Sequence, residues 1–291
     1  MQFIKRFALL VSSCAFVFNV ARADEVNAEK GVQVRRDITF LKRGGKSLHL
    51  HLLRPSKLPA RPLPVVIWVH GGLWRSGSHD KMPPLLSELS RRGYAVASVE
   101  FRSSQQATFP AQLDDLRAAT RFLRSNSRAY SLDGAKIGVA GISTGGHLAS
   151  LLGLSGAANA VAEICGPTDL TTLEKGSRLD WNEEDGPVFA LLGGSAQEKA
   201  ALSRAASPVS RVSKKAPPFL ILHGDGDSLV PVSQSEALFQ KLKNAGTEVS
   251  YRVYAGEEHG LRGVKDQTDA EIIRFFDKWL KAPVAKAPAV R

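Results

Sequence analysis

The chain has 291 residues, of which 43% are hydrophobic and 23% are charged. These proportions are those of an ordinary globular protein with a core, and they exclude a chain that is disordered throughout. The formal net charge is +11 and the sequence pI is about 9.8. The length suits one large domain of mixed helices and strands.

The first 23 residues have the pattern of a cleavable export signal. Lys5 and Arg6 give a basic start, residues 7–20 form an apolar run, and Ala21 and Ala23 are the small residues that a signal peptidase recognises. The apolar run is shorter than the about 20 residues that a membrane-spanning helix needs. We therefore expect a signal peptide at 1–23, a secreted or periplasmic protein and no stable membrane insertion.

A second pattern in the leader concerns its cysteine. Val11-Ser12-Ser13-Cys14 resembles a lipoprotein cleavage box, but cleavage there would leave almost no apolar stretch before the site. Cleavage after Ala23 is favoured, and lipid anchoring at Cys14 is the alternative. Cleavage after Ala23 would leave Cys165 as the one remaining cysteine, so no internal disulfide is expected. Because Cys165 follows an apolar run, a buried hydrophobic role is favoured over a reactive thiol.

The charge balance bears on possible partners. Removal of the leader takes away three basic residues and lowers the formal net charge from +11 to +8. This excess favours attraction to anionic polymers, cell-wall material or membrane surfaces. The sequence has no Lys/Arg run interleaved with aromatic residues and no zinc-ligand spacing, so a nucleic-acid partner is not expected.

Strand-like and helix-like segments alternate from Gly31 onward. Near-continuous apolar runs predict strands that helices cover on both faces, and the first two form a hairpin. The predicted strands lie at 34–40, 48–53, 64–69, 94–99, 136–140, 160–164, 219–222 and 249–254. Apolar residues at helical spacing predict helices at 84–92, 110–125, 147–152, 233–244 and 268–280. This alternation predicts an α/β fold with a mostly parallel central sheet and helices on both faces.

One long stretch interrupts the alternation. Residues 166–217, after the sixth predicted strand, contain no clear strand and are broken by Gly, Pro and Ser. Connections of this length are usually functional, so we expect a lid-like insertion that helps to form the pocket walls. The repeating Ala, Pro, Val and Lys of 282–291 predict a disordered basic tail. The expected organisation is thus a signal peptide, a single domain at 24–281 and this tail.

A candidate nucleophile lies in Gly141-Ile142-Ser143-Thr144-Gly145, which fits the G-x-S-x-G pattern. In this motif the chain turns sharply from a strand into a helix with the serine at the tip. Side chains two residues on either side would collide with neighbouring backbone. Here the motif follows a predicted strand and precedes a helix, which is the context that it requires.

A glycine-containing loop, His70-Gly71-Gly72-Leu73-Trp74, directly follows the predicted strand at 64–69. In hydrolases with a G-x-S-x-G serine, backbone N–H groups of such a loop stabilise the developing oxyanion. The candidate donors are Gly71, Gly72 and Leu73, together with the N–H of Thr144. His70 is expected to hold the loop rather than to take part in the reaction.

The acid and the base should follow the serine in chain order. His259 lies after the last predicted strand and is the candidate base that takes the proton from Ser143. The acid has two main candidates, Asp225 and Asp227, at the end of the strand 219–222. Asp169 is a third acidic residue, for which a turn or helix cap is favoured.

Five stretches together resemble the bacterial feruloyl-esterase-like and acetyl-esterase branch of the α/β-hydrolases. They are HGGLWRSGS (70–78), FPAQLDDLRAATRFLRSN (109–126), GISTGGHLA (141–149), ASPVSRV (206–212) and HGDGDSLVPVSQSE (223–236). The resemblance implies the α/β-hydrolase fold and selects Asp227 as the acid. It also implies hydrolysis of a small-molecule or polysaccharide-linked ester through an acyl-enzyme.

Two departures from the family pattern affect the loops that face the substrate. Leu73 stands where many members have a third glycine, and Thr144 stands where alanine is common. Both residues keep their backbone N–H groups, so the oxyanion hole should survive while the acyl pocket becomes narrower or more polar. The nucleophile, base and donors all come from the protein, so no metal or organic cofactor is implied.

Three alternatives remain open at this point. The HGG-x-W pattern also resembles arylformamidases, although an export signal is unusual for an enzyme that acts on a cytoplasmic metabolite. A prolyl-oligopeptidase-like peptidase shares the Ser-Asp-His order but has a propeller domain that this sequence lacks. A non-catalytic binding protein on the same fold is the third, and an intact triad argues against it. The sequence does not indicate the oligomeric state.

Overall fold

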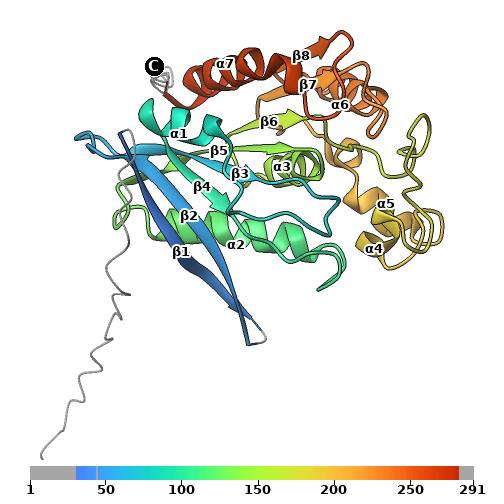
Figure 1. Cartoon of the computed structure of the whole chain (residues 1–291), viewed down its shortest axis with the longest axis horizontal. Helices are drawn as coiled ribbons and strands as arrows, with labels where there is room; N and C mark the ends of the chain where they lie inside the picture. Colours follow the sequence, from blue (N-terminus) through green and yellow to red (C-terminus); the bar gives the residue numbers. More distant parts are fainter. Residues whose placement is uncertain (1–30, 44, 282–291) are drawn as a thin grey trace, which may run out of the picture.

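The computed structural model describes residues 31–43 and 45–281. The predicted signal peptide at 1–23, the alternative lipid site at Cys14 and the predicted tail at 282–291 lie outside these residues. Within them, eight strands form one sheet in the order β1-β2-β4-β3-β5-β6-β7-β8 (Figure 1). The pairs β1–β2 and β2–β4 are antiparallel, and all the other neighbouring pairs are parallel.

Every predicted strand has a counterpart in this sheet. The strands are β1 (Val32–Arg43), β2 (Lys46–Pro55), β3 (Leu63–Val69), β4 (Ala95–Val99), β5 (Leu132–Ile142), β6 (Ala160–Ile164), β7 (Phe219–Gly224) and β8 (Val249–Tyr254). The main helices are α1 (Pro84–Arg91), α2 (Ala111–Ser125), α3 (Thr144–Leu154), α6 (Ser233–Asn244) and α7 (Lys265–Phe276). The predicted α/β-hydrolase fold, with a mostly parallel sheet, is confirmed.

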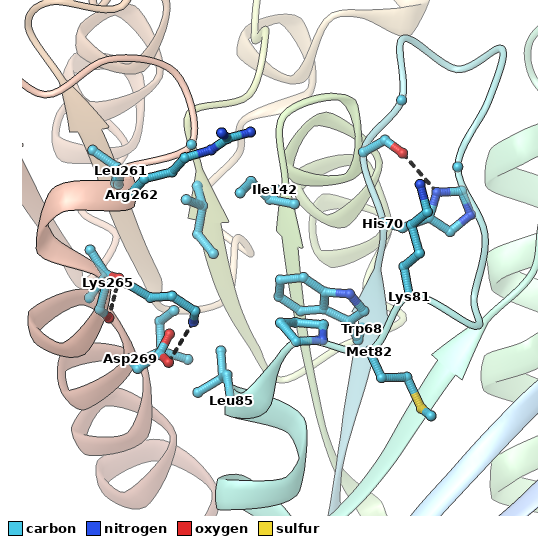
Figure 2. A pocket seen from close by; sticks show the side chains of 18 of the residues that line it. Trp68, His70, Lys81, Met82, Leu85, Ile142, Leu261, Arg262, Lys265 and Asp269 are labelled. Carbon is cyan, nitrogen blue, oxygen red and sulfur yellow. Dashed lines mark hydrogen bonds and ion pairs between the residues drawn. The ribbon is translucent and has the colours of Figure 1, made fainter.

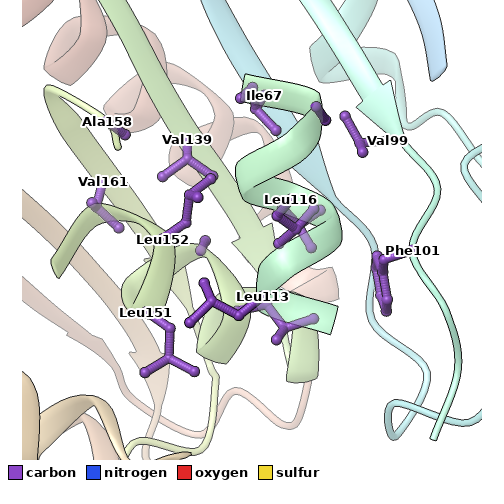
Figure 3. Packing of buried hydrophobic residues seen from close by; sticks show 14 of the residues in the cluster. Ile67, Val99, Phe101, Leu113, Leu116, Val139, Leu151, Leu152, Ala158 and Val161 are labelled. Atoms are coloured by element: carbon purple, nitrogen blue, oxygen red, sulfur yellow. The ribbon is translucent and has the colours of Figure 1, made fainter. Parts of the chain in front are cut away.

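Helices cover both faces of the sheet, because alternate strand residues point to opposite faces. On β3, Val65 and Ile67 belong to the hydrophobic cluster that α2, α3 and α6 cover. Their neighbours Val66 and Trp68 belong to the second cluster, which α1 and α7 cover (Figure 1). Figure 3 shows the first cluster, where leucines of α2 and α3 pack on the sheet. The central strands are therefore buried on both sides, which explains their near-continuous apolar sequences.

Three elements begin three or four residues before the predicted start. The helix after the G-x-S-x-G motif begins at Thr144 rather than at 147, because the chain enters the helix directly after the serine. β5 begins at Leu132, four residues before the predicted start, since Leu132 pairs with Leu63 of β3. The last helix begins at Lys265 and continues beyond Phe276 as a short π-helix.

The stretch 166–217 lies between β6 and β7, as the sequence predicts for an insertion after the sixth strand. It contains the helices α4 (Pro187–Leu192) and α5 (Ala200–Ala206) and the 3-10 turn Pro208–Arg211. Trp181 and Leu191 of this insertion are fully buried in the first hydrophobic cluster, so it packs as part of the core. Among residues 31–43 and 45–281, no helix combines the length and the hydropathy that a membrane span requires.

Candidate active site

The candidate catalytic side chains meet at the carboxyl ends of the parallel strands, where α/β folds place ligands. Ser143 follows β5, Asp227 follows β7 and His259 follows β8. The loop that carries Gly71 and Gly72 follows β3, the direct neighbour of β5. Residues that are up to 188 positions apart in the chain, from Gly71 to His259, thus meet at the same ends of the strands.

Ser143 lies at the tip of a strained turn between β5 and α3. Its φ is 58° and its ψ is −130°, a backbone conformation that is costly for a residue with a side chain. A side chain at Gly141 would collide with the carbonyl of Gly145, and one at Gly145 would collide with the carbonyl of Val69. These contacts explain why the motif needs both glycines.

Ser143, His259 and Asp227 form one hydrogen-bonded chain. The Nε2 atom of His259 lies 2.9 Å from Oγ of Ser143, and its Nδ1 lies 2.6 Å from Oδ2 of Asp227. Because a carboxylate can only accept here, Nδ1–H donates to Asp227, and Nε2 is left to accept from the serine hydroxyl. The histidine is therefore held in the tautomer that a general base requires.

Asp227 is held as a carboxylate by its surroundings. Burial raises its pKa, but hydrogen bonds from His223 and His259 outweigh this effect and keep the pKa below its usual value. Its Oδ1 also accepts the backbone N–H groups of Leu229 and Val230, each at 2.9 Å. The carboxylate is thus charged and fixed in direction.

The other two acidic candidates make different contacts. Oδ1 of Asp225 accepts the backbone N–H of Gly256 at 2.6 Å, which ties the loop after β7 to the turn after β8. Oδ1 of Asp169 accepts the backbone N–H and the hydroxyl of Thr171, at 3.0 and 2.6 Å. These are turn-stabilising contacts, and within the described residues neither side chain bonds to His259.

The loop after β3 passes directly beside the serine. A side chain at Gly71 would lie 2.9 Å from the carbonyl oxygen of Ile142 and 3.1 Å from Cβ of Ser143, so this close approach favours glycine. Gly72 has a φ of 130° and Leu73 has a φ of 57°, which turns the loop back on itself. Within the described chain, the N–H groups of Gly72 and Leu73 donate no hydrogen bond. The N–H of Thr144 opens α3 and has no partner within the helix.

Trp74 connects this loop to α3 and to the insertion. Its indole Nε1–H donates to Nδ1 of His147 at 3.1 Å, and Nε2 of His147 donates to the carbonyl of Ala206 at 2.7 Å. Complete burial lowers the pKa of His147 to about 4, so the ring is neutral and one nitrogen accepts while the other donates. Arg75 adds a second link, because its Nη2 donates to the carbonyl of Gly186 at 2.8 Å.

His70 does not join the hydrogen-bonded chain. Its Nδ1 lies 2.8 Å from the carbonyl of Gly71, and its ring stacks on Phe101 with the centroids 4.5 Å apart. Burial lowers its pKa, so the ring is neutral near neutral pH. These contacts agree with the predicted role of holding the loop.

Behind Asp227 lies a buried polar network that the sequence interpretation missed. Nε2 of His223 lies 2.8 Å from the carbonyl of Val230, and its Nδ1 lies 2.6 Å from Oγ of Ser235. Ser235 lies 3.2 Å from Oε2 of Glu163, and Oε1 of Glu163 accepts a backbone N–H. Burial raises the pKa of Glu163 to about 7. The one feature of the sequence that could have indicated this network is Glu163, a single acidic residue within an otherwise apolar strand.

Among residues 31–43 and 45–281, two groups of side chains present possible metal ligands within 4.8 Å of one another. In the first, Cys165 joins Asp227 and His259, but the latter two are bonded to each other and burial raises the pKa of the Cys165 thiol. Cys165 is thus buried as predicted, with a position beside the triad that was not predicted. The second group comprises Asp37, His51 and His79 and includes none of the predicted site residues.

A comparison with models of protein families identifies the family of this chain. Residues 50–242 match the model of the family described as BD-FAE, which covers the sequence from β2 to the end of α6. The chain belongs to the BD-FAE family. The match includes the loop after β3, the serine motif and Asp227, whereas His259 lies beyond it.

Known proteins similar to this BD-FAE chain include esterases. Esterase LipC of Mycobacterium tuberculosis is 30% identical over 253 residues, covering 78% of this chain and 61% of LipC. Esterase LipQ of the same organism is 32% identical over 244 residues, covering 77% of this chain and 57% of LipQ. The chain thus spans less than two thirds of both relatives. A truncated carbohydrate esterase from gut microbiota superposes with a TM-score of 0.77, at 27% identity, over 84% of this chain and 95% of that one.

A cavity of about 680 Å³ adjoins the site of this BD-FAE chain (Figure 2). It is bordered by Gly71 and Gly72 of the loop after β3, by Ile142 next to the serine, and by Gly260 next to His259. We expected the insertion 166–217 to supply pocket walls, and for this cavity that expectation was wrong. Its described walls come from the loop after β3, from α1 and from α7 instead, since the insertion packs into the core on the other face of the sheet.

Proposed function

We propose that this protein is a secreted serine esterase that hydrolyses carboxylic esters through an acyl-enzyme. The observation that carries the proposal is the hydrogen-bonded chain from Ser143 through His259 to Asp227, with N···O separations of 2.9 and 2.6 Å. Such a chain, beside unpaired backbone N–H groups, provides the nucleophile, the base and the electrophilic stabilisation of acyl transfer.

The first half of the proposed reaction forms the acyl-enzyme. Oγ of Ser143 attacks the ester carbonyl carbon while Nε2 of His259 takes the hydroxyl proton. The carboxylate of Asp227 stabilises the resulting imidazolium. The oxyanion accepts hydrogen bonds from the N–H groups of Gly72, Leu73 and Thr144, and Gly71 keeps the loop close to the reacting carbon. Such donors are each worth about a hundredfold or more in rate.

Expulsion of the alcohol completes the acyl-enzyme, and the second half of the reaction then hydrolyses it and releases the acid. The imidazolium of His259 protonates the leaving alcohol as the tetrahedral intermediate collapses, and the acyl group stays on Ser143. Water then enters in place of the alcohol, gives its proton to His259 and attacks the acyl carbon through a second oxyanion intermediate. Collapse of this intermediate returns the proton to Ser143 and frees the carboxylic acid.

The similar proteins support the reaction class and suggest where substrates could be found. The printed names of LipC and LipQ describe esterases, and the gut-microbiota neighbour is described as a carbohydrate esterase. We therefore propose a small-molecule or polysaccharide-linked ester as the substrate. Export after Ala23 is part of the same proposal, because it would bring the enzyme to material outside the cytoplasm.

Labelling with a fluorophosphonate tests the nucleophile. The wild-type protein should bind the probe covalently and hydrolyse p-nitrophenyl acetate, because the reagent reacts with an activated serine. Ser143→Ala should lose the label and about four to six orders of magnitude in kcat. Probe attachment to the Ser143→Ala variant would refute the assignment, and failure of the wild type to react would favour a non-catalytic binding protein.

The leaving group is tested separately. Acetylated xylan, feruloyl esters and N-formylkynurenine should be offered to the same preparation at matched concentrations. The ester proposal predicts a higher kcat/KM for the best ester than for the formamide. The reverse order would assign the protein to arylformamidase-like amide hydrolysis.

A further inference from the structure

The cavity beside the triad carries information about the substrate, and the inference below rests on the proposed esterase function. Residues next to each catalytic element border it, namely Gly72, Ile142 and Gly260. A group that is attached to an ester carbon at Ser143 can therefore extend directly into the cavity. Its volume of about 680 Å³ lies in the range of pockets that hold small-molecule ligands.

Most of the cavity wall is apolar. The contributing side chains are Trp68, Met82, Leu85, Ile142, Leu261 and Ile272. Trp68 and Leu85 are almost completely buried and come from β3 and α1, so the wall is built on fixed elements of the second hydrophobic cluster. Such a surface favours a hydrocarbon or aromatic part of a substrate.

Charged groups around the cavity are predominantly positive. Lys81, Arg262 and Lys265 line it, and Asp269 is the one acidic side chain among the described residues that do so. Nζ of Lys265 pairs with Oδ2 of Asp269 at 2.7 Å, which neutralises one cation. Lys81 and Arg262 pair with no carboxylate among the described residues. The cavity thus carries two uncompensated positive charges.

The two uncompensated cations come from different loops. Lys81 precedes α1, whereas Arg262 follows His259 and precedes α7. Figure 2 shows them on opposite sides of the cavity, with Ile142 and Trp68 between them. The lowered pKa of His70, caused by burial, keeps this neighbouring ring neutral near neutral pH. The positive charge is therefore concentrated in Lys81 and Arg262.

We infer that the cavity accommodates a carboxylate-bearing part of the ester substrate. The apolar wall binds its hydrocarbon or aromatic portion, and the positive charges of Lys81 and Arg262 attract the carboxylate. A substrate of this class satisfies both the apolar surface and the unpaired charges, whereas a neutral ester leaves the cations to the solvent alone. The esterase thereby prefers monoanionic esters over neutral esters of the same size.

Matched ester pairs test this preference on the wild-type enzyme. For the acyl side, mono-p-nitrophenyl glutarate is compared with p-nitrophenyl hexanoate. For the alcohol side, the acetate ester of p-(hydroxymethyl)benzoate is compared with p-isopropylbenzyl acetate. We expect kcat/KM to be about three- to tenfold higher for the anionic member of at least one pair, as for one or two ion pairs to exposed cations. Raising sodium chloride from about 0.02 M to about 0.5 M should reduce this ratio.

Variants assign the preference to residues. Lys81→Gln and Arg262→Gln should each lower the ratio of anionic to neutral kcat/KM, and the double variant should bring it to about one or below. The matched control is Lys241→Gln on α6, an exposed lysine that does not line the cavity, and it should leave the ratio unchanged.

The outcomes separate this inference from the proposed function. Hydrolysis of the neutral esters with no anionic preference in either pair would overturn the inference while the esterase function stands. A preference that persists in the double variant, or that does not fall with salt, would also overturn it. Absence of hydrolysis of all four esters, together with no fluorophosphonate labelling, would reject the proposed function itself.

Discussion

Two aspartates that lie two residues apart have different partners, and a pair of variants separates their roles. Oδ2 of Asp227 lies 2.6 Å from Nδ1 of His259, whereas Asp225 accepts the N–H of Gly256. Asp227→Asn should lower kcat by about 10⁴, because an amide stabilises the wrong histidine tautomer. Asp225→Asn should remain within about tenfold of the wild type, since the asparagine Oδ1 can still accept the N–H of Gly256 and Asp225 makes no bond to His259.

Steady-state kinetics with p-nitrophenyl acetate measures both variants. The assignment would be reversed if Asp225→Asn lost the larger share of kcat. Fluorophosphonate labelling at a fixed time provides an independent readout, because the reagent reports on activation of Ser143 without the deacylation step.

At the scale of elements, the loop after β3 depends on a helix and on the insertion for its position. Trp74→Phe removes the donor to Nδ1 of His147 and leaves a fully buried nitrogen without a partner. We expect the free energy of unfolding to fall by about 1–3 kcal/mol. We also expect kcat to fall about tenfold or more, because the donors of the adjacent oxyanion loop lose their alignment.

The control for this variant is Tyr94→Phe. The hydroxyl of Tyr94 donates to Oδ1 of Asp277 at 2.9 Å, directly after α7, and neither residue lines the cavity beside the triad. It should also lower the free energy of unfolding while kcat stays unchanged. Equal losses of kcat in the two variants would show that the effect of Trp74 is general destabilisation. Urea unfolding and initial rates measure the two quantities.

The elements could be predicted from sequence to the extent that local patterns determine them. The runs on β3 and β7 are apolar because both faces are covered, and the two glycines of the serine motif mark a turn that no other residue fits. The predicted starts of α3 and β5 were wrong by three and four residues. The turn at Ser143 fixes the start of α3, and the pairing of Leu132 with Leu63 fixes the start of β5.

The residues of the candidate site were predictable only where a local sequence pattern marks them. Ser143 and His259 were proposed from their motifs and chain order, whereas the choice of Asp227 over Asp225 came from the family resemblance. The contact between Glu163 and Ser235 joins residues 72 positions apart, and no local pattern reports it. The origin of the cavity walls was likewise missed, because it depends on which face of the sheet the insertion covers.

At the scale of the whole molecule, Glu163 makes the stability of the fold depend on pH. Burial raises its pKa from 4.5 to about 7, so the folded protein binds a proton that the unfolded chain releases over this range. Its stabilising contribution is complete below pH 4.5 and is lost as the pH rises through 7. The loss amounts to about 3 kcal/mol at most.

Glu163→Gln should remove this dependence. The glutamine amide can donate to Ser235 and accept the N–H of Gly166, as a protonated glutamate does. Compared with this variant, the wild type should become progressively less stable as the pH rises from about 4.5 to 7. Urea unfolding at several pH values measures the difference, and the exposed Glu184→Gln should show none. A constant difference across this range would contradict the raised pKa.

The hydrogen bonds around Trp74 also mean that the insertion 166–217 cannot be treated as a separate part of the molecule. The insertion 166–217 is linked to the loop after β3 through the carbonyls of Ala206 and Gly186, which accept hydrogen bonds from His147 and Arg75. Because of these two hydrogen bonds, the insertion could not be replaced by an unrelated segment without loss of contacts to the rest of the domain. We expect that another segment could replace it only if its backbone carbonyls still reached the side chains of Arg75 and His147. A change in the path of the insertion would then disturb the loop beside the serine, although the two lie about a hundred residues apart in the chain.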